Sequence, residues 1–535
     1  MKPMIFYGRT RMSDGKGVVI KSLILRAAAL TFAAGTGLCA QGAAFASDKS
    51  EQSRPNVLLV VFDDLNDWVK PLSDAPSATP NLSAFARESA VFTQASTASP
   101  VCNPSRVALL TGVHPTVSGI YNNAQVYPRV DHWIKDARNL PQHFRDNGYI
   151  AAGYGKIFHH RHVEAYENAD IWTPGYYAPW NLEKEEALPE AAEMRIEIPG
   201  LKRHFGRLPD DWDRDDPSKM QQDTLNTLSA VNFLNGAHDK PFFLALGIYR
   251  PHTHWYAARR YWDKFPREKI ALAEGVKEGD LDDVPPYGRL LAYADAGDKR
   301  SPEDYADLKA TPEFAERAPF MRNLRQDYLV DHDLYKDAQR AYLASVAYAD
   351  DMFGRVMAAL EASGYADNTI VVVVSDHGYH LGEKEHWHKS TMWERSMRVP
   401  FMIRDVRPGR RNVRINTPVS LLDVFPTLVD MTGINAPKHD LNGVDLAPVL
   451  SGERRDRGRP VVSTLYRGFH SVRNDQYRFI RYPDGTTELY DMQKDPWEWS
   501  NLSGNDRYAP IVKELSSWVP SAEEETVGHV GDKAP

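Results

Sequence analysis

The sequence predicts an α/β fold built on a buried sheet of the parallel type, followed by a smaller C-terminal domain. Three observations predict it: short apolar runs rich in β-branched residues, a long helical pattern directly before one of them, and a change of texture after about residue 435. With 535 residues, the chain is too long for one compact core and is expected to divide into a large and a small domain.

The apolar runs are Asn56–Phe62, Phe242–Ile248 and Thr369–Val374. Nearly continuous apolar sequence of this length is typical of strands that are buried on both faces, as in a parallel sheet. A helix is expected before the third run, because apolar residues recur at three- and four-residue spacing: Tyr342, Val346, Ala349, Phe353, Val356 and Leu360. Helix followed by buried strand is the rhythm of a layered α/β sheet.

Shorter elements complete this pattern. Asn139–Gly148 is expected to be a helix that leads into a strand at Tyr149–Tyr154. Glu164–Lys336, rich in Pro, Trp and Asp, is expected to be mostly irregular and to build the walls of a site.

The texture changes after about residue 435. His470–Tyr482 and Thr486–Tyr490 are expected to form antiparallel strands joined by a turn at residues 483–485, and Ile511–Trp518 a helix. We therefore predict a large α/β domain over residues 47–435 and an antiparallel-sheet domain over residues 436–535.

The first 46 residues resemble a signal peptide. Basic residues precede an apolar stretch, Ala27–Ala34, that is too short to span a bilayer, and Ala44-Phe45-Ala46 suits a signal peptidase. An uncleaved amphipathic anchor is the alternative. Since no later stretch is apolar enough to cross a membrane, we predict cleavage near Ala46, no stable membrane insertion, and a periplasmic or secreted protein.

Cleavage changes the charge and the cysteine content. The segment holds six Lys/Arg and one Asp, so the formal net charge changes from −8 to −13, which disfavours nucleic acid as a partner. Cys39 leaves with the segment, and Cys102 then has no cysteine to pair with. A lone cysteine is either an inert small hydrophobe or a reactive group, and composition leaves both open.

Acidic residues follow two of the predicted strands. Asp63 and Asp64 are adjacent and repel each other unless a cation lies between them, for which a hard divalent ion is the natural choice. Asp376 and His377 follow the third run, at the same expected sheet edge. Solvated loop acids are the alternative at each place, but the two clusters together favour one shared metal. The donor set leaves Ca²⁺, Mg²⁺, Mn²⁺ and Zn²⁺ open.

Cys102 begins a third pattern, Cys-Asn-Pro-Ser-Arg, which continues into Val107–Thr111. Pro104 suits a first helical turn, so Cys102 is expected at a helix N-terminus, where the dipole favours an anion. Arg106 lies one turn on and is expected to pair with it.

The residues Cys102 to Arg106, followed by Leu-Thr-Gly, resemble the signature of the sulfatases. The resemblance continues through Asp63-Asp64, the block Ser375–Pro400 and the ending Glu488–Leu502, and so covers most of the mature chain. Gly155–His159 and Arg250–His252 are most similar to the branch that contains iduronate-2-sulfatase and choline-sulfatase.

This resemblance implies an alkaline-phosphatase-like α/β fold with a mixed, mainly parallel sheet and a small C-terminal α+β domain with an antiparallel sheet. It implies hydrolysis of a sulfate ester, on a sugar unit of a sulfated polysaccharide. A maturation enzyme would oxidise Cys102 to formylglycine, and one divalent cation, usually calcium, would bind beside it. A phosphodiesterase or phosphonate monoester hydrolase of the same fold is the nearest alternative. A non-catalytic glycan-binding protein is disfavoured, because all the expected catalytic positions are filled.

The resemblance also assigns residues. The implied metal ligands are Asp63, Asp64, Asp376, His377 and the modified Cys102. Many members of the family have Asn where this chain has His377, whereas the iduronate type has His. The implied catalytic residues are Arg106, Lys156, His159, His252 and Lys389. Arg250 stands where Lys is common, which keeps the charge and changes the hydrogen-bond geometry. His386 and His388 are candidates for the substrate pocket, with packing as the alternative.

The implied chemistry is covalent catalysis. Arg106 would hold the hydrated aldehyde, while metal and cations neutralise charge on the sulfate. One hydroxyl, activated by the metal and Asp376, would attack sulfur, and His252 or Lys389 would protonate the leaving oxygen. The second hydroxyl, deprotonated by His159, would then expel sulfate.

An acidic protein that binds an anion is expected to carry a local positive rim. Candidates for it are His160, Arg161, His162, His254, Arg259 and Arg260, with a solvated charged face as the alternative. Trp133, Trp255 and Tyr256 are candidates for stacking on sugar rings, with simple packing as the alternative.

Overall fold

The computed structural model describes residues 54–130, 132–159, 170–179, 188–198, 203–293, 329–407 and 413–528. The predicted signal peptide with its cleavage site, and His160, Arg161 and His162, lie outside the described residues. Among the helices in these ranges, including the 28-residue α14 (Tyr335–Ala362), none combines the length and the apolar character needed to cross a membrane.

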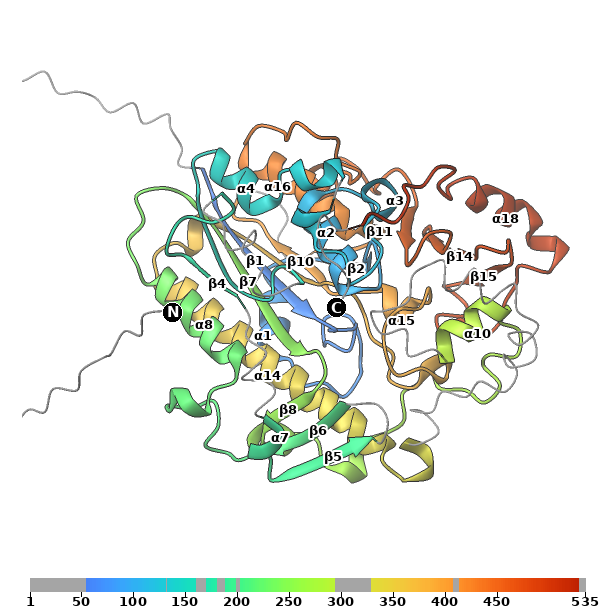
Figure 1. Cartoon of the computed structure of the whole chain (residues 1–535), viewed down its shortest axis with the longest axis horizontal. Coiled ribbons are helices and arrows are strands. Elements are labelled where there is room, and N and C mark those ends of the chain that lie inside the picture. Colours follow the sequence, from blue (N-terminus) through green and yellow to red (C-terminus); the bar gives the residue numbers. More distant parts are fainter. Residues whose placement is uncertain are drawn as a thin grey trace, which may run out of the picture. The chain divides into compact units, whose positions relative to one another are not determined.

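The central sheet has eight strands in the order β11-β2-β10-β9-β1-β7-β3-β4 (Figure 1). Their bounds, in that order, are Val413–Ser420, Ala90–Ser96, Phe401–Arg404, Thr369–Ser375, Asn56–Asp63, Phe242–Pro251, Ile150–Gly155 and Tyr177–Pro179. All neighbours are parallel except β10, which runs antiparallel to β9 and to β2. The mixed, mainly parallel sheet is therefore confirmed, and β1, β7, β9 and β3 occupy the four predicted strand regions.

Strand β1 is buried on both faces, as its continuous apolar sequence predicts. Its side chains alternate between two cores: Leu58, Val60 and Phe62 pack in one cluster, and Val57, Leu59 and Val61 pack in the other. Figure 1 shows helices on both sides of the sheet. The first cluster includes residues of α1 (Pro80–Ala86), α8 (Gln222–Leu234) and α14, and the second includes residues of α2 (Cys102–Thr111), α4 (Leu140–Asp146) and α16 (Val424–Thr432).

Two helix predictions are confirmed. Helix α14 contains the whole predicted pattern and ends before Gly364, whose φ is +80°. Helix α4 begins with a capping box in which the side chain of Asn139 accepts from the backbone N–H of Gln142 and the Gln142 side chain accepts from the backbone N–H of Asn139.

The prediction that Glu164–Lys336 is mostly irregular was wrong for the described parts of this segment. These parts contain α8, α9 (Arg259–Trp262) and α10 (Pro286–Tyr293), and a three-stranded sheet of order β5-β6-β8. The strands are Met194–Ile198, Arg203–Leu208 and Trp255–Ala258. Helix α8 escaped notice because polar residues such as Asp223, Thr224 and Asn226 lie on its buried face, which weakens the hydrophobic periodicity.

The C-terminal region forms a four-stranded antiparallel sheet of consecutive strands β12 to β15. They span Val461–Thr464, His470–Arg473, Tyr477–Arg481 and Thr487–Asp491. The predicted single strand His470–Tyr482 is in fact β13 and β14, because the side chain of Asn474 accepts from the backbone N–H of Gln476 and Tyr477 and turns the chain. Helix α18 (Ala509–Ser516) corresponds to the predicted last helix. The domain boundary at residue 435 stays a prediction.

The other α-helices of the described residues are short. They are α3 (Pro115–Ser118), α7 (Leu188–Ala191), α15 (Glu394–Met397) and α17 (Ala447–Ser451).

Candidate active site

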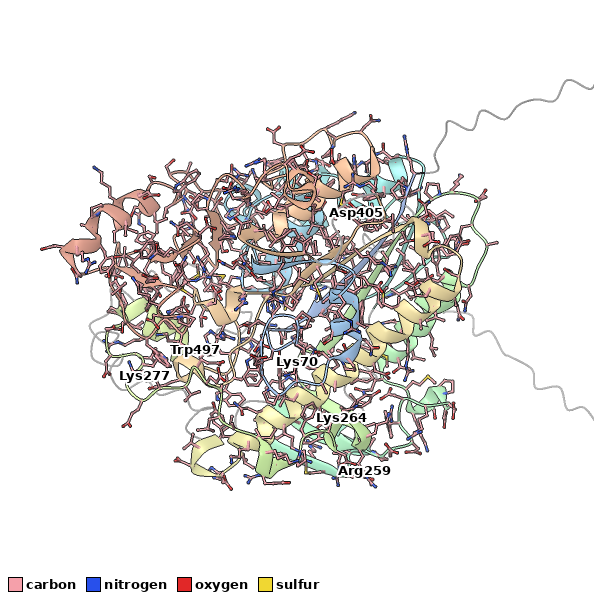
Figure 2. The ribbon with its side chains drawn as sticks, turned by 180° about the vertical axis from the view of Figure 1, so that it is seen from behind. Lys70, Arg259, Lys264, Lys277, Asp405 and Trp497 are labelled. Atoms are coloured by element: carbon pink, nitrogen blue, oxygen red, sulfur yellow. The ribbon has the colours of Figure 1, made fainter. Side chains whose placement is uncertain are left out.

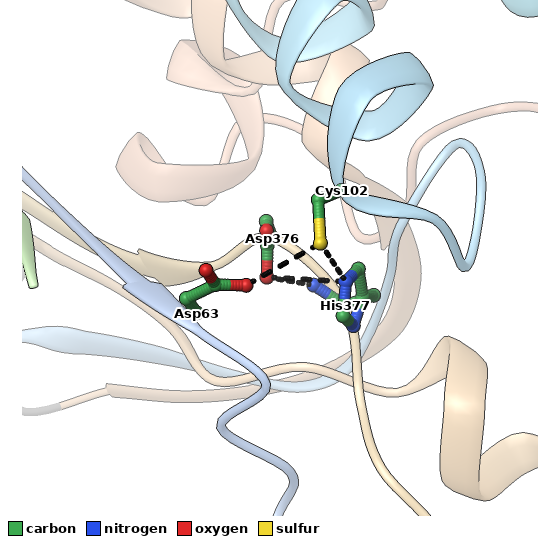
Figure 3. A group of neighbouring side chains, drawn as sticks. All are labelled: Asp63, Cys102, Asp376 and His377. Atoms are coloured by element: carbon green, nitrogen blue, oxygen red, sulfur yellow. Dashed lines mark hydrogen bonds and ion pairs between the residues drawn. The ribbon is translucent and has the colours of Figure 1, made fainter. Parts of the chain in front are cut away.

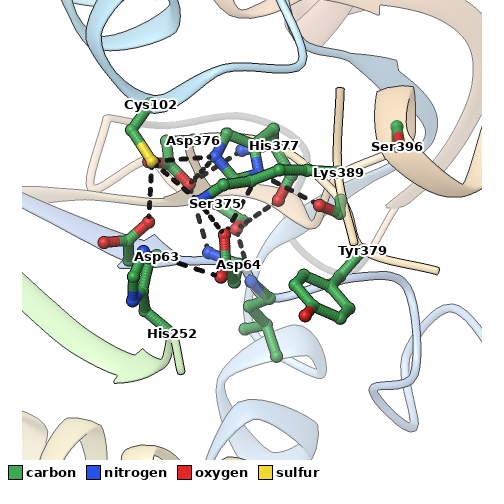
Figure 4. Close-up of polar contacts among 12 residues, drawn as sticks. Asp63, Asp64, Cys102, His252, Ser375, Asp376, His377, Tyr379, Lys389 and Ser396 are labelled. Atoms are coloured by element: carbon green, nitrogen blue, oxygen red, sulfur yellow. Dashed lines mark hydrogen bonds and ion pairs between the residues drawn. The ribbon is translucent and has the colours of Figure 1, made fainter. Parts of the chain in front are cut away.

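The carboxyl ends of four neighbouring strands, β9, β1, β7 and β3, meet at one edge of the sheet. Asp376 and His377 follow β9, Asp63 is the last residue of β1 and Asp64 follows it, His252 follows β7, and Lys156 follows β3. Ligands of open α/β sheets bind at this edge. Helix α2 adds Cys102, and the segment after β9 adds Lys389, so that groups far apart in the sequence form one cluster (Figure 4).

Cys102 lies at the first position of α2, as predicted, and is fully buried. Its Sγ lies 3.5 Å from Oδ1 of Asp63, 3.2 Å from Nε2 of His377 and 2.9 Å from Nζ of Lys389. Burial, reinforced by Asp63, raises the pKa of the Cys102 thiol. Unmodified, this side chain is therefore a neutral thiol and a poor nucleophile.

Three carboxylates, those of Asp63, Asp64 and Asp376, are fully buried around the sulfur atom. The pairing of Phe62 with Ser375 in neighbouring strands brings Asp63 and Asp376 together (Figure 3). Burial by itself would raise the pKa of the Asp63 carboxyl, but Lys156, His252, Arg106 and Lys389 hold it well below its usual value.

Arg106 binds two of these carboxylates. Its Nε donates to Oδ2 of Asp376 at 2.9 Å, and its Nη2 lies 3.8 Å from Oδ2 of Asp63. Its Nη1 donates to the carbonyl oxygen atoms of Lys156 and Ile157. The expected direct pair with Cys102 is not formed: Arg106 holds the carboxylates beside the sulfur atom instead.

Lys156 pairs with Oδ2 of Asp63. Its place depends on two glycines, because a Cβ at Gly155, where φ is +82°, would lie 2.1 Å from the carbonyl oxygen of Gly247, and a Cβ at Gly247 would lie 2.0 Å from the carbonyl oxygen of Lys156. Without side chains at these positions, the end of β3 approaches β7 closely. His159 lies three residues further and is half-buried, and its catalytic role stays a prediction.

Lys389 reaches the cluster from the loop after β9. Its Nζ donates to Oδ1 of Asp64 at 2.7 Å, and Nε2 of His252 lies 3.9 Å from the other oxygen atom of that carboxylate. Burial would lower the pKa of Lys389, but Asp64 and Cys102 hold it well above its usual value, so the amine stays protonated. Arg106, Lys156 and Lys389 thus offset the charge of the three carboxylates.

The predicted metal ligands fit a divalent cation. Donor atoms of Asp63, Cys102, Asp376 and His377 all lie within 4.8 Å of one another, and so do those of Asp63, Asp64, Cys102 and His252. Oδ2 of Asp64 is buried and accepts no hydrogen bond from the described residues. Buried carboxylate oxygen atoms that converge in this way suit a hard cation.

The three predicted substrate contacts lie around this cluster. Arg250 is fully buried and donates to Oε1 of Gln221 at 3.2 Å and to the carbonyl oxygen of Tyr256 at 3.4 Å. Ring nitrogen atoms of His386 and His388 lie 3.0 and 3.2 Å from the carbonyl oxygen of Lys389. Both histidines therefore hold the backbone that carries Lys389, and substrate contact stays a prediction.

Sequence reasoning missed two residues that position the site. The hydroxyl of Ser105 donates to the carbonyl oxygen of Asp376 at 2.5 Å, and its place in the Cys102 motif was the signal. The hydroxyl of Tyr342, which the helical pattern assigned to the core, bonds the backbone of Asp64 and Asn66. No local sequence signal distinguishes such a buried tyrosine from a packing residue.

The residues considered for a positive rim or for stacking on sugar rings differ in burial and partners. Arg259 pairs with Glu193 and lies at the edge of the molecule in Figure 2, and Arg260 donates to the carbonyl oxygen of Trp212 at 2.8 Å. Trp255 and Tyr256 are buried packing residues, so the stacking role considered for them was wrong. The ring nitrogen of Trp255 donates to the carbonyl oxygen of Pro251 at 2.7 Å. Trp133 is exposed.

Comparison with protein families finds two matches. The sulfatase family model matches residues 55–434, and the model described as N-sulphoglucosamine sulphohydrolase, C-terminal, matches residues 382–525.

Curated relatives include a sulfatase of Formosa agariphila, 31% identical, with 88% of this chain and 87% of the relative covered. The choline-sulfatase of Rhizobium meliloti is 28% identical, covering 85% of this chain and 83% of its own. The iduronate 2-sulfatase of Homo sapiens is 27% identical, covering 71% of this chain and 70% of its own.

Solved structures share the fold. One, in complex with its substrate D-glucosamine-2-N,6-O-disulfate, has a TM-score of 0.62 at 22% identity and covers 87% of this chain and 96% of its own. The phosphonate monoester hydrolase of Agrobacterium radiobacter has a TM-score of 0.63 at 21% identity, covering 87% of this chain and 94% of its own.

Proposed function

The chain belongs to the sulfatase family, and we propose that it removes sulfate from a sulfated carbohydrate, on a unit of a polysaccharide. In this proposal Cys102 is converted to formylglycine by a maturation enzyme, and one divalent cation, Ca²⁺, binds beside it. The protein is exported, with a signal peptide cleaved near Ala46.

One observation carries the proposal: Cys102 lies at a helix N-terminus, within hydrogen-bond distance of Asp63, His377 and Lys389. A helix N-terminus with nearby cations favours an anion. The same surroundings, through burial and Asp63, raise the pKa of the thiol. A neutral thiol has little use in an anion site, whereas its oxidation product, a hydrated aldehyde, supplies oxygen nucleophiles there.

The carboxylates of Asp63, Asp64 and Asp376, with His377, are the residues that would hold the cation. Buried oxygen donors favour Ca²⁺ over softer ions, whereas the imidazole of His377 is a ligand that transition metals such as Zn²⁺ also accept. When bound, the cation would polarise the sulfate and lower the pKa of an oxygen nucleophile. Arg106 fixes Asp63 and Asp376 from the side of α2, so that both carboxylates keep their orientation in the buried site.

The basic residues divide into two groups. Lys156 and Arg106 lie against Asp63, on the side of the nucleophile. Lys389 and His252 lie against Asp64, where they can bind the sulfate oxygen atoms and give a proton to the leaving alcohol. A raised pKa keeps Lys389 protonated, which suits charge neutralisation. His159 is the candidate base for the release of sulfate.

The relatives support a sugar substrate. A relative named for iduronate and a structural neighbour bound to a sulfated glucosamine both act on or bind sugar sulfates, whereas the choline-sulfatase name indicates a small alcohol. Arg250, His386 and His388 remain the candidates for substrate contact, either directly or through the backbone that they hold.

The nearest alternative is hydrolysis of a phosphonate monoester or phosphodiester, since a phosphonate monoester hydrolase shares the fold. Steady-state kcat/KM on matched aryl sulfate, aryl phosphate and aryl phosphonate esters separates the two. We expect sulfate to be preferred, and a clear preference for phosphorus would overturn the proposal.

The substrate is then sought with defined sulfated sugars and protein matured in its own host. The mass of the peptide that contains Cys102 reports conversion of thiol to aldehyde, which removes sulfur. Cys102→Ala should abolish turnover. A variant as active as the wild type would show that the nucleophile is elsewhere.

A further inference from the structure

A cavity lies outside the catalytic cluster. It has a volume of about 550 Å³ and lies between the residues around α4 and the segment after α16. Its walls include Trp133, Arg138, Asp146, Asn147, Asn435 and Lys438, and we call it the Trp133 cavity. Cavities of roughly 300–1,000 Å³ hold small ligands, so the Trp133 cavity is large enough for a sugar ring.

Trp133 forms one wall of this cavity, and 42% of its surface is exposed. It lies on the short helix η2 (Trp133–Asp136), which is fixed by packing and by a hydrogen bond. The neighbouring Ile134 is fully buried, and the hydroxyl of Tyr127 donates to the carbonyl oxygen of Ala137 at 2.7 Å. The indole is therefore an exposed aromatic surface on a fixed support.

The opposite wall is fixed by hydrogen bonds. Nε2 of His143 lies 2.7 Å from the carbonyl oxygen of Asn435, and Nε2 of His439 lies 2.8 Å from the carbonyl oxygen of Thr111. The side-chain oxygen of Asn147 accepts from the backbone N–H of Asn435 at 3.4 Å. These contacts hold both walls in place, so the cavity exists before any ligand binds.

The charges of the cavity nearly cancel. Arg138 pairs with Asp146 at 3.0 Å, with about half of each side chain exposed, and Asp136 and Lys438 also line the walls. An exposed pair of this kind contributes roughly 0–1 kcal/mol, so its groups remain available to a ligand. Balanced charge, an aromatic face and hydrogen-bonding side chains suit a sugar ring, which has an apolar face and a hydroxylated edge.

The Asn147 end of the cavity lies far from Cys102. Arg54, which precedes β1, donates to the carbonyl oxygen of Asn147 at 3.0 Å, whereas Asp63 lies at the other end of β1. A strand of this length spans about 23 Å. A small substrate at the catalytic cluster therefore does not reach this end of the cavity, so a ligand that binds at both places must be a polymer.

We propose that the Trp133 cavity is a secondary subsite for a pyranose unit of the polymeric substrate, held by stacking and hydrogen bonds rather than by charge. This inference rests on the proposed function for the identity of the polymer. It predicts that Trp133 contributes to affinity for the polysaccharide and not to the turnover of small sulfate esters.

The test compares Trp133→Ala and Trp133→Phe with the full-length wild type. Binding is measured as retardation in native gels that contain ulvan, heparan sulfate or carrageenan, or their chemically desulfated forms. Kinetics of sulfate release are measured on an aryl sulfate and on the polymer that the enzyme desulfates. Trp518→Ala is the matched control, since Trp518 is 41% exposed and lies outside the Trp133 cavity.

We expect Trp133→Ala to weaken retardation by at least one polymer and to raise the KM for the polymer about tenfold, a loss of about 1.4 kcal/mol. The Phe variant should be intermediate, and kcat/KM on the aryl sulfate should not change. Retardation should persist on desulfated polymer and at roughly 0.5 M salt, where charge attraction is screened.

Equal retardation of wild type and Trp133→Ala on every polymer would overturn the inference. An equal loss of retardation in Trp518→Ala would also overturn it. So would loss of the wild-type retardation at high salt, because binding would then depend on charge and not on stacking. If the wild type cleaves no sulfate ester but its retardation still depends on Trp133, the subsite stands and the proposed function fails.

Discussion

The hydroxyl of Tyr342 lies 2.9 Å from the carbonyl oxygen of Asp64 and donates to it. The hydroxyl oxygen of Tyr342 in turn accepts from the backbone N–H of Asn66 at 3.0 Å. Asp64 has a φ of +64°, a conformation that an aspartate adopts at a cost and that its surroundings must maintain. The tyrosine, on α14, therefore fixes the turn that presents a candidate metal ligand.

Tyr342→Phe should weaken binding of the cation without removing any ligand. The change leaves a buried N–H and a buried carbonyl without a partner, which costs about 1–3 kcal/mol. We expect a higher metal concentration at half-maximal activity and a lower unfolding midpoint. Tyr348→Phe is the matched control, because Tyr348 is buried on the same helix and bonds Thr224 instead. Equal metal dependence in the two variants would show that Tyr342 acts on stability alone.

Local patterns predicted the fold where one residue type or period dominates. The apolar runs of β1, β7 and β9 reveal strands that are buried on both faces, and acidic residues directly after β1 and β9 mark the ligand edge of the sheet. The two acidic clusters meet because parallel neighbours place their carboxyl ends together, which a sequence pattern can anticipate.

Other features depend on contacts between distant residues. Arg106 was expected to pair with Cys102 one turn away, but Asp63 and Asp376 attract its guanidinium more strongly. The hydrophobic periodicity of α8 is weak because polar residues lie on its buried face. Their hydrogen-bond partners are remote in sequence: Asp223, for example, accepts from the backbone N–H groups of Tyr249 and Arg250. Partners that are remote in sequence leave no local signal.

Removal of metal should lower both activity and stability. Asp63, Asp64 and Asp376 are buried together, and a cation that binds only the folded state stabilises it by an amount that grows with the logarithm of the free cation concentration, about 2.7 kcal/mol at a hundredfold excess over Kd. Treatment with a chelator should abolish turnover and lower the unfolding midpoint, and Ca²⁺ should restore both. Asp64→Asn should lose the metal-dependent shift of the midpoint. An unfolding midpoint insensitive to chelator and to added Ca²⁺ would contradict the metal assignment.

Arg106→Lys should keep the positive charge but lose the directed hydrogen bonds of the guanidinium group. The guanidinium donates at once to Asp376 and to two carbonyl oxygen atoms, which an ammonium group on a flexible stem cannot do in the same directions. We expect kcat/KM on an aryl sulfate to fall roughly 10²-fold or more. Arg404→Lys is the control, because Arg404 is also buried but lies away from the cluster: it faces Val371 near the start of β9, whereas Asp376 follows the end of that strand. Arg404 pairs with Glu361, and its variant should keep full activity. Similar kinetic losses in both variants would indicate a general effect on folding.

Glu498 should make stability depend on pH. It is buried beside Glu394, and both carboxylates face Arg478. Burial raises the pKa of Glu498 to about 8. Arg478 lowers this pKa and the negative charge of Glu394 raises it further, so the effect of burial prevails. Arg478 and Arg473 overcome the effect of burial on Glu394 and lower its pKa to about 2. Near neutral pH the folded protein therefore holds one proton on Glu498.

The unfolded chain releases that proton near its ordinary pKa of 4.5. Between pH 4.5 and about 8 the folded state thus binds more protons, so the contribution of Glu498 to stability falls as pH rises through this window. We expect the free energy of unfolding of the wild type to drop from pH 5.5 to 8.5 by on the order of 1–3 kcal/mol more than that of Glu498→Gln. Urea titrations of both proteins at the two pH values measure the change in unfolding free energy with pH. A loss of stability that the substitution causes equally at both pH values cancels in this comparison. Glu514→Gln, at an exposed position on α18, should keep the wild-type slope. If Glu498→Gln also keeps it, the proton is held elsewhere in the folded protein.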